Sequence, residues 1–286
     1  LPRPRRKGLL SPAPPLSSRI AVTKLVYIGG YGHSGSTLLE YLLTASPEVL
    51  ACGEVASVLR DRLRKGKCTC GRRVKECPVW GPIFAAPEAL GAMTHETLVR
   101  ALLAQDRGAH AVLVDSSKTA WRSIAVPFRL NRELGADFQF VHLVRDPRGV
   151  SWSAVEKAGR RGMRPLMPLR CGSAALGWWI ANLACEAFGR RYPECYLRVT
   201  YEELARSPRE TMRDLVAKLV PGSEWRPEDM GGSDNRHQFH GNRMRSESLS
   251  LAEVKEDVAW TRDMPRLSRA LVSLLTAPLR RRYGYA

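Results

Sequence analysis

Residues 25–43 read Leu-Val-Tyr-Ile-Gly-Gly-Tyr-Gly-His-Ser-Gly-Ser-Thr-Leu-Leu-Glu-Tyr-Leu-Leu. Four apolar residues precede a glycine-rich turn, and after the turn leucines recur at helical spacing. The apolar start is typical of a strand that is buried on both faces of a parallel sheet. We therefore expect an α/β fold in a single domain, with a central parallel sheet flanked by helices.

The turn has the spacing of a phosphate-binding P-loop, G-x-x-x-x-G-K-[ST], from Gly30 to Thr37, but Ser36 replaces the lysine. Its glycines allow the backbone to adopt positive φ and to approach a ligand closely; they are Gly29, Gly30, Gly32 and Gly35. The free N–H groups at the start of the helix favour an anion. A strand-to-helix connection without a ligand is the alternative. Because the missing lysine normally reaches the β- and γ-phosphates, ATP or GTP hydrolysis is disfavoured.

Composition narrows the class of protein. With 286 residues, 44% of them hydrophobic, the chain is long enough for one large α/β domain. It has no apolar run of the roughly 18–20 residues that a transmembrane helix needs, so we expect a cytoplasmic protein. Residues 1–20 are rich in arginine, proline and serine and lack the apolar core of a signal peptide. We interpret them as a flexible basic arm before a domain that spans residues 21–286.

The formal net charge of +17 indicates anionic ligands such as phosphates, sulfates or nucleic acid. The basic residues are spread along the chain, however, and no zinc-finger, homeodomain or RNA-recognition signature accompanies them. We therefore expect no nucleic-acid partner.

A second phosphate-binding element is predicted downstream. Residues 138–144 are typical of a strand, and Pro147 favours the start of a helix soon after it. Arg145 then lies at the carboxyl end of the strand and Ser153 about two turns into the helix, so both side chains can reach one phosphate. A salt bridge with a helix cap would explain the same residues without a ligand.

Together the two elements resemble the sulfotransferases that use 3′-phosphoadenosine 5′-phosphosulfate (PAPS), most closely in motif the tyrosylprotein type. In that family a strand–loop–helix motif, [KR]-[ST]-G-[ST]-[ST], holds the 5′-phosphosulfate, and an arginine and a serine after a later strand hold the 3′-phosphate. Here Arg145 and Ser153 match the second motif, and the first reads His33-Ser34-Gly35-Ser36-Thr37. The resemblance extends over most of residues 24–286 and implies PAPS as co-substrate.

Two further segments imply catalytic residues. Cys52-Gly53-Glu54 resembles the segment that carries the catalytic base of tyrosylprotein sulfotransferases, and a carboxylate suits an acceptor hydroxyl that must lose its proton. Lys118, after a predicted strand, is similar to a family lysine and would offset charge on the sulfuryl group. The resemblance thus implies in-line transfer with Glu54 as base and without a metal. A solvated loop acid and a charge at a helix start remain the alternatives for these two residues.

His33 departs from the family pattern, which has lysine or arginine at the contact with the bridging oxygen of the donor. A histidine can donate a hydrogen bond and, as a cation, assist the departing phosphate. We expect it to act as leaving-group acid or electrostatic stabiliser. A spacer that only hydrogen-bonds the loop is the alternative.

Further nucleotide contacts are implied near the carboxyl end. Residues 196–204 resemble the last core strand of the family and the Tyr-Glu-Glu-Leu that follows it, which makes Tyr201 a candidate. Arg243 and Arg245 lie in a polar, glycine-containing segment and are candidates for the 3′-phosphate or the adenosine.

Three of the seven cysteines, Cys68, Cys70 and Cys77, are close in sequence. Their C-x-C-x6-C spacing is not a standard zinc pattern, and a fourth ligand is missing. We predict reduced thiols or one local crosslink and no metal, with zinc and a ligand from elsewhere in the chain as the alternative.

The sequence does not specify the acceptor. The basic segment 159–170 is a candidate lid over the acceptor, or else a mobile surface loop. We expect a hydroxyl on a small molecule, natural product, glycan or glycolipid, with protein tyrosine as the alternative. A P-loop kinase would use a strand-end aspartate such as Asp115, but the missing lysine counts against it. A non-catalytic nucleotide-binding protein would leave Glu54 and Lys118 unexplained.

Overall fold

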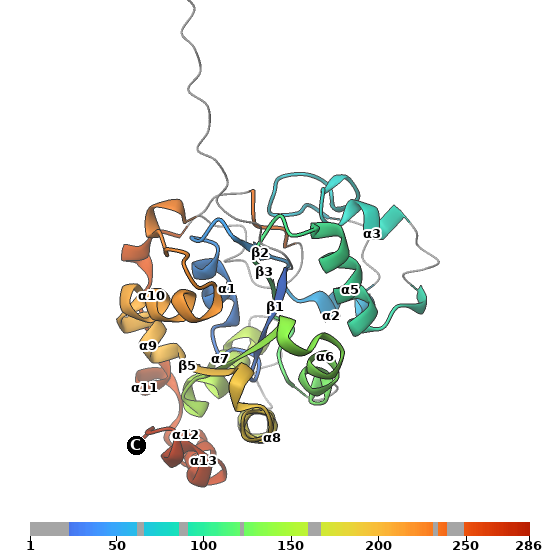
Figure 1. The fold of residues 1–286 in the computed structure, drawn as a ribbon. Helices are drawn as coiled ribbons and strands as arrows, with labels where there is room; N and C mark the ends of the chain where they lie inside the picture. The colour runs from blue at the N-terminus through green and yellow to red at the C-terminus, as the bar shows by residue number, and fades with distance from the viewer. Residues whose placement is uncertain are drawn as a thin grey trace, which may run out of the picture.

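The computed structural model describes residues 23–61, 66–85, 91–120, 123–159, 167–230, 234–238 and 249–286. Its centre is a five-stranded parallel sheet with the strand order β2-β3-β1-β4-β5 (Figure 1). The strands are β1 (Lys24–Gly29), β2 (Val49–Ala51), β3 (Val112–Asp115), β4 (Phe138–Val144) and β5 (Tyr196–Thr200). The predicted single α/β domain is confirmed. The arm predicted at residues 1–20 lies outside the described residues.

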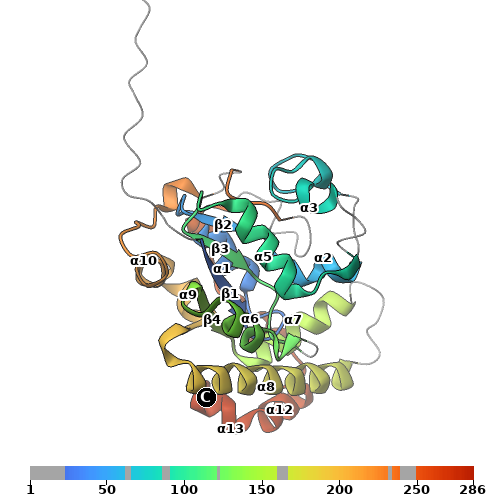
Figure 2. The same cartoon turned by 45° about the vertical axis from the view of Figure 1, so that its right-hand side comes forward.

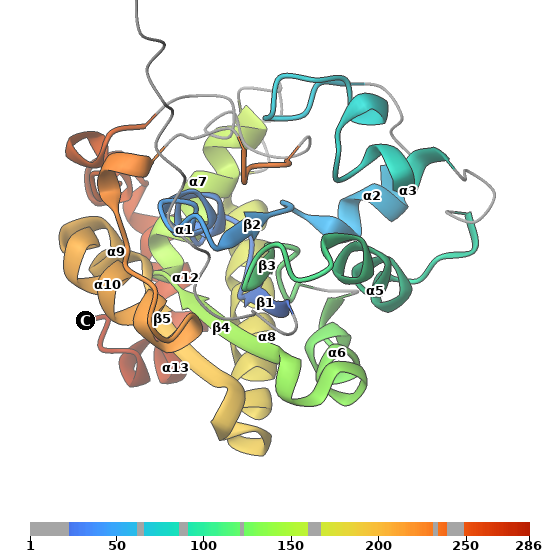
Figure 3. The same ribbon diagram turned by 45° about the horizontal axis from the view of Figure 1, so that its top comes forward.

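Helices cover both faces of the sheet. Helices α1, α9 and α10 pack on one face, and α2, α5, α6 and α8 pack on the other (Figures 1 and 3). Helices α7 and α12 pack against α8 (Figure 2). The bounds are α1 (Ser36–Leu43), α2 (Val55–Asp61), α3 (Gly81–Ala85), α5 (His95–Asp106), α6 (Val126–Leu134), α7 (Pro147–Gly159), α8 (Met167–Arg191), α9 (Tyr201–Arg206), α10 (Pro208–Leu219), α11 (Ala259–Asp263), α12 (Arg266–Leu275) and α13 (Ala277–Arg282). None of these described helices is long and apolar enough to cross a lipid bilayer.

Strand β1 is buried on both faces, as its sequence predicts. Leu25 and Tyr27 belong to the core beneath α2, α5, α6 and α8, and Val26 and Ile28 belong to the core beneath α1 and α10. All four side chains are fully buried. The alternation follows from the two-residue period of a strand, and two helical layers are needed to cover it.

The topology brings the predicted site residues to one edge. Strand β1 pairs in parallel with β3 on one side and with β4 on the other, so the chain reverses its direction of travel across the sheet at β1. Ligands of open α/β sheets bind outside the carboxyl ends of the strands at such a reversal. The loops that follow β1, β2, β3 and β4 carry His33, Glu54, Lys118 and Arg145 respectively.

A buried histidine links the sheet to α8. His142 in β4 is fully buried, and its ring nitrogens contact the Tyr196 hydroxyl at 2.6 Å and Asn182 Oδ1 at 2.7 Å. The neutral ring satisfies both partners, because Nε2–H donates to Asn182 and Nδ1 accepts from Tyr196. Burial lowers the pKa of His142 from 6.5 to about 4.

We predict that His142 makes folding stability fall in acid. The unfolded chain takes up a proton at this residue near pH 6.5, whereas the folded protein takes it up only near pH 4, so stability is lost as pH falls through that window. Relative to the His142→Gln variant, the wild type should lose about 2 kcal/mol more between about pH 7 and about pH 5. Chemical unfolding at the two pH values measures the difference. Equal losses in both proteins would contradict the assignment.

Candidate active site

The turn between β1 and α1 requires glycine at two positions with positive φ. Gly30 has a φ of 119°, and a Cβ there would lie 2.4 Å from the carbonyl oxygen of Leu143. Gly35 has a φ of 95°, and a Cβ there would lie 2.6 Å from the Tyr201 ring. A side chain at either position would therefore collide with its neighbour and strain the backbone.

Gly29 and Gly32 do not adopt the positive φ that glycine allows. Gly29 is needed for space, because a Cβ would lie 2.2 Å from the Phe140 ring on the neighbouring strand. Gly32 meets no described atom within 4 Å and lies on the open side of the turn. The left-handed conformation is found instead at His33, which has a φ of 67°.

The loops at the carboxyl edge enclose one pocket, and it collects most of the predicted site. Its lining includes ten of those residues: Gly32, His33, Gly35, Ser36, Thr37, Glu54, Lys118, Arg145, Ser153 and Tyr201. Ser34 is not among the lining residues. It is buried, and its Oγ has no hydrogen-bond partner in the described part of the chain. Arg243 and Arg245 lie outside the described residues.

Some lining residues were missed by the sequence reasoning. Lys157 lies one helical turn beyond Ser153 on α7, a spacing from which it could have been found. The others come chiefly from a segment without a recognisable pattern, namely Leu249, Glu253, Val254, Lys255 and Asp257, together with Leu38 on α1.

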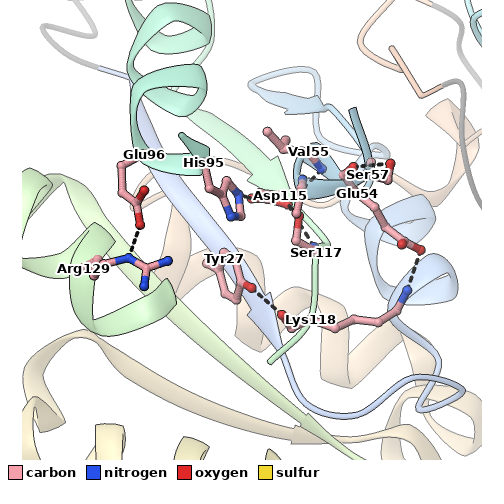
Figure 4. Close-up of polar contacts among 12 residues, drawn as sticks. Tyr27, Glu54, Val55, Ser57, His95, Glu96, Asp115, Ser117, Lys118 and Arg129 are labelled. Atoms are coloured by element: carbon pink, nitrogen blue, oxygen red, sulfur yellow. Dashed lines mark hydrogen bonds and ion pairs between the residues drawn. The ribbon is translucent and has the colours of Figure 1, made fainter. Parts of the chain in front are cut away.

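Glu54 and Lys118 form an ion pair within the pocket (Figure 4). Lys118 Nζ lies 2.5 Å from Glu54 Oε1, and each side chain is 19% exposed. The carboxylate comes from the loop between β2 and α2, and the ammonium from the loop after β3. Partial burial and a fixed partner orient both groups towards the same space.

Buried Asp115 fixes the loop that carries Glu54 (Figure 4). Its Oδ1 accepts hydrogen bonds from the backbone N–H of Val55 at 3.3 Å and of Ser117 at 2.9 Å. Its Oδ2 lies 2.6 Å from Nε2 of buried His95. The carboxylate therefore anchors the start of α2, next to Glu54.

Buried Glu40 on α1 joins the same loop to the P-loop helix. Its two oxygens accept from the Gly53 N–H at 2.6 Å and from the Ser116 hydroxyl at 2.8 Å. Gly53 has a φ of 76°. The chain thus turns sharply just before Glu54, and the buried N–H of Gly53 is held by the Glu40 carboxyl group.

The Lys118 loop is also bonded to the P-loop. The N–H of Thr119 donates to the carbonyl of Gly30 at 2.9 Å, and the Tyr27 hydroxyl donates to the carbonyl of Lys118. Lys118 has a φ of 69°, an uncommon conformation for a residue other than glycine. These contacts define the position from which the lysine side chain extends.

Arg145 forms a wall of the pocket. Its guanidinium donates to the carbonyl of His33 at 3.1 Å and to both the carbonyl (2.9 Å) and Oδ2 (3.0 Å) of Asp257. It also lies 4.2 Å above the Tyr201 ring. Ser153 is close by, with its Oγ 3.2 Å from Nδ1 of His33. Both Arg145 and Ser153 therefore contact His33 of the P-loop and line the same pocket.

The surroundings of His33 favour its neutral form. Burial and the neighbouring cations Lys157, Lys118 and Arg145 lower its pKa from 6.5 to about 4, and Glu54 opposes them only weakly. Three cationic side chains thus lie near the ring, an arrangement that favours an anion in this part of the pocket.

Comparison with known proteins identifies the family. A model of the sulfotransferase family matches residues 26–227, most of the chain. The chain therefore belongs to the sulfotransferase family, as its motifs predict. No curated protein matches its sequence significantly.

Solved structures agree with this fold. The sulfotransferase domain of the curacin biosynthetic pathway matches with a TM-score of 0.60 and 18% identity over 90% of this chain and 98% of that domain. The sulfotransferase domain of the Synechococcus PCC 7002 olefin synthase matches with a TM-score of 0.59 and 19% identity, over 93% and 96% of the two chains. Mouse sulfotransferase SULT7A1, complexed with PAP, matches with a TM-score of 0.50 and 11% identity, over 92% and 86%.

Proposed function

We propose that this protein transfers the sulfuryl group of PAPS to a hydroxyl group of its acceptor. One observation carries the proposal. A single pocket joins a P-loop that lacks the Walker lysine, the Arg145–Ser153 pair, and the Glu54 carboxylate with its lysine partner. The first two suit a nucleotide with phosphate at two positions, and the third suits deprotonation of a hydroxyl.

The binding assignment follows the predicted motifs. Backbone amides of residues 33–37 would hold the 5′-phosphosulfate at the start of α1, and Arg145 with Ser153 would hold the 3′-phosphate. A dianionic phosphate at Arg145 would replace Asp257 as the partner of the guanidinium. The mouse relative bound to PAP, the nucleotide product of such a transfer, supports this choice of co-substrate.

The proposed transfer forms one bond to sulfur, breaks another and moves one proton. The acceptor oxygen forms a bond to sulfur while the bond from sulfur to the bridging phosphate oxygen breaks. The hydroxyl proton passes to Glu54, and adenosine 3′,5′-bisphosphate leaves with the bonding electrons. Charge spreads over the sulfuryl oxygens in the transition state, where Lys118 and the loop amides stabilise it.

Two observations bear on the alternatives. Asp115, the strand-end aspartate that a P-loop kinase would use for magnesium, is buried and bonded to His95 and to the backbone at the start of α2. Two structural relatives belong to the curacin pathway and to an olefin synthase. These relatives favour a small-molecule or natural-product acceptor over protein tyrosine.

Nucleotide binding tests the proposal directly. Adenosine 3′,5′-bisphosphate should raise the unfolding temperature more than ATP does at equal concentration, because only it offers a 3′-phosphate to Arg145. Arg145→Gln should weaken its binding roughly 10- to 100-fold, the loss of charged hydrogen bonds to phosphate. Titration calorimetry measures the affinity, and Arg190→Gln, on the exposed side of α8, is the control. A preference for ATP would overturn the proposal.

The role of Glu54 predicts a loss in turnover. Glu54→Gln keeps the shape of the side chain but removes the base, so kcat should fall by about 10²–10⁴-fold while affinity for PAPS changes little. An acceptor found by screening hydroxylated metabolites with PAPS provides the assay. Glu48→Gln, which alters a carboxylate bonded to Ser223 away from the pocket, is the matched control. Turnover of Glu54→Gln near that of wild type would exclude the base assignment.

We also propose that His33 gains a proton when the donor binds and then assists the leaving phosphate. The negative phosphosulfate would counter the cations that lower its pKa in the free protein. In wild type, kcat should therefore decline on the alkaline side. In His33→Arg, with a permanent cation, the plateau should extend to higher pH, whereas His33→Gln should lower kcat throughout. An unchanged pH profile in His33→Arg would rule out this role.

A further inference from the structure

The three clustered cysteines meet a histidine from a distant part of the chain. Cys68, Cys70 and Cys77 lie beside His237, and one ligand atom from each falls within 4.8 Å of all the others. Cys68, Cys77 and His237 are buried, and Cys70 is partly buried. The structure therefore supplies the fourth ligand that the cysteine spacing alone lacks.

The separations fit a tetrahedral metal better than a disulfide. Cys68 Sγ lies 3.6 Å from Cys77 Sγ, and His237 Nδ1 lies 3.1 Å from Cys77 Sγ and 3.9 Å from Cys68 Sγ. Around tetrahedral zinc, with Zn–S about 2.3 Å and Zn–N about 2.0–2.1 Å, ligand atoms are roughly 3.5–3.8 Å apart. A disulfide would need sulfur atoms about 2.05 Å apart.

The histidine is oriented for metal binding. Its Nε2 lies 3.1 Å from the carbonyl of Asp234, so Nε2–H donates there and the lone pair of Nδ1 points towards the sulfurs. The backbone of His237 is held on both sides. Its N–H donates to the carbonyl of Ala51 at 2.8 Å, and its carbonyl accepts from the indole of buried Trp80 at 2.5 Å.

The cysteine turn is fixed to the histidine segment by backbone contacts. The N–H of Gly71 donates to the carbonyl of Cys68 at 2.9 Å, which closes a tight turn around Cys70. The N–H of Thr69 donates to the carbonyl of Gln238 at 2.8 Å, and its hydroxyl accepts from the Gln238 N–H at 2.9 Å. These backbone contacts hold the ligand segments together, which lowers the entropic cost of binding an ion.

We propose that Cys68, Cys70, Cys77 and His237 bind a structural zinc ion. Three thiolates and one imidazole nitrogen complete a tetrahedral shell, which leaves no open position for catalysis. Binding would release the thiol protons to solvent. The inference rests on these four residues alone and is independent of the proposed sulfuryl transfer.

The position of the site indicates what the ion would stabilise. Asn235 and Arg236 lie beside the end of β2, where the Ala51 N–H donates to the carbonyl of Asn235 at 2.9 Å. The ion would therefore tie the cysteine turn to the edge of the sheet, just before the loop that carries Glu54. Loss of the ion should loosen this edge and lower the unfolding temperature.

Metal analysis of the full-length wild type is the first test. Protein purified under reducing conditions without chelator should contain about one zinc per chain by mass spectrometry. Replacement by Co²⁺ should give the intense visible absorption of tetrahedral cobalt bound to thiolates. Absence of both zinc and this spectrum would overturn the proposal. A Cys68–Cys77 disulfide in protein alkylated without reduction would do so too.

Variants assign the ligands. His237→Ala and Cys77→Ser should each reduce the zinc content by about tenfold or more, because three ligands hold the ion much less tightly. Cys195→Ser removes another buried thiol, far from the cluster in sequence, and should keep full zinc. Unchanged zinc in both ligand variants would refute the assignment.

Chelation of the wild type avoids the risk that a variant fails to fold. Removal of zinc should lower the unfolding temperature, and addition of zinc but not magnesium should restore it. An unfolding temperature that is indifferent to chelation, in protein shown to lose its zinc, would exclude the structural role.

Discussion

The buried carboxylate of Glu40 is the contact on which the arrangement of the site depends. It lies on the P-loop helix and bonds the loop before Glu54 through Gly53 and the loop before Lys118 through Ser116. Separation of these three segments would break two buried hydrogen bonds to a carboxylate, at a cost of about 1–3 kcal/mol each. One side chain thus couples the glycine-rich turn to both groups of the candidate catalytic pair.

The sequence predicted the elements whose signals are local. Each of these signals lies within a short stretch of sequence, because backbone geometry sets the spacing of residues in a strand, a turn or a helix. They are the apolar run of residues 25–28, the glycine turn and the leucine spacing of α1. Arg145 and Ser153 were found for the same reason, since a strand end and the next helix fix their separation. The family resemblance supplied Glu54 and Lys118, which no local period indicates.

What the sequence could not provide depends on contacts between distant segments. Gly29 is required because the Phe140 ring occupies the space of a side chain, a fact of the packing between β1 and β4. Asp257 reaches Arg145 from the far end of the chain, and His237 reaches the cysteines from a segment beside β2. Such long-range contacts depend on the path of the folded chain, which the spacing of residues in the sequence does not specify.

Tyr201 has a consequence for how this pocket can change. Its ring packs against Gly35 and beneath Arg145, and its hydroxyl accepts the N–H of Asp257 at 2.9 Å. The Tyr201 side chain thus contacts three parts of the pocket wall. A substitution in any one of them would therefore disturb the contacts of Tyr201 with the other two. The apolar lining residues Leu38, Leu249 and Val254 make none of these contacts, so the shape of the pocket can vary there while the contacts of Tyr201 stay intact.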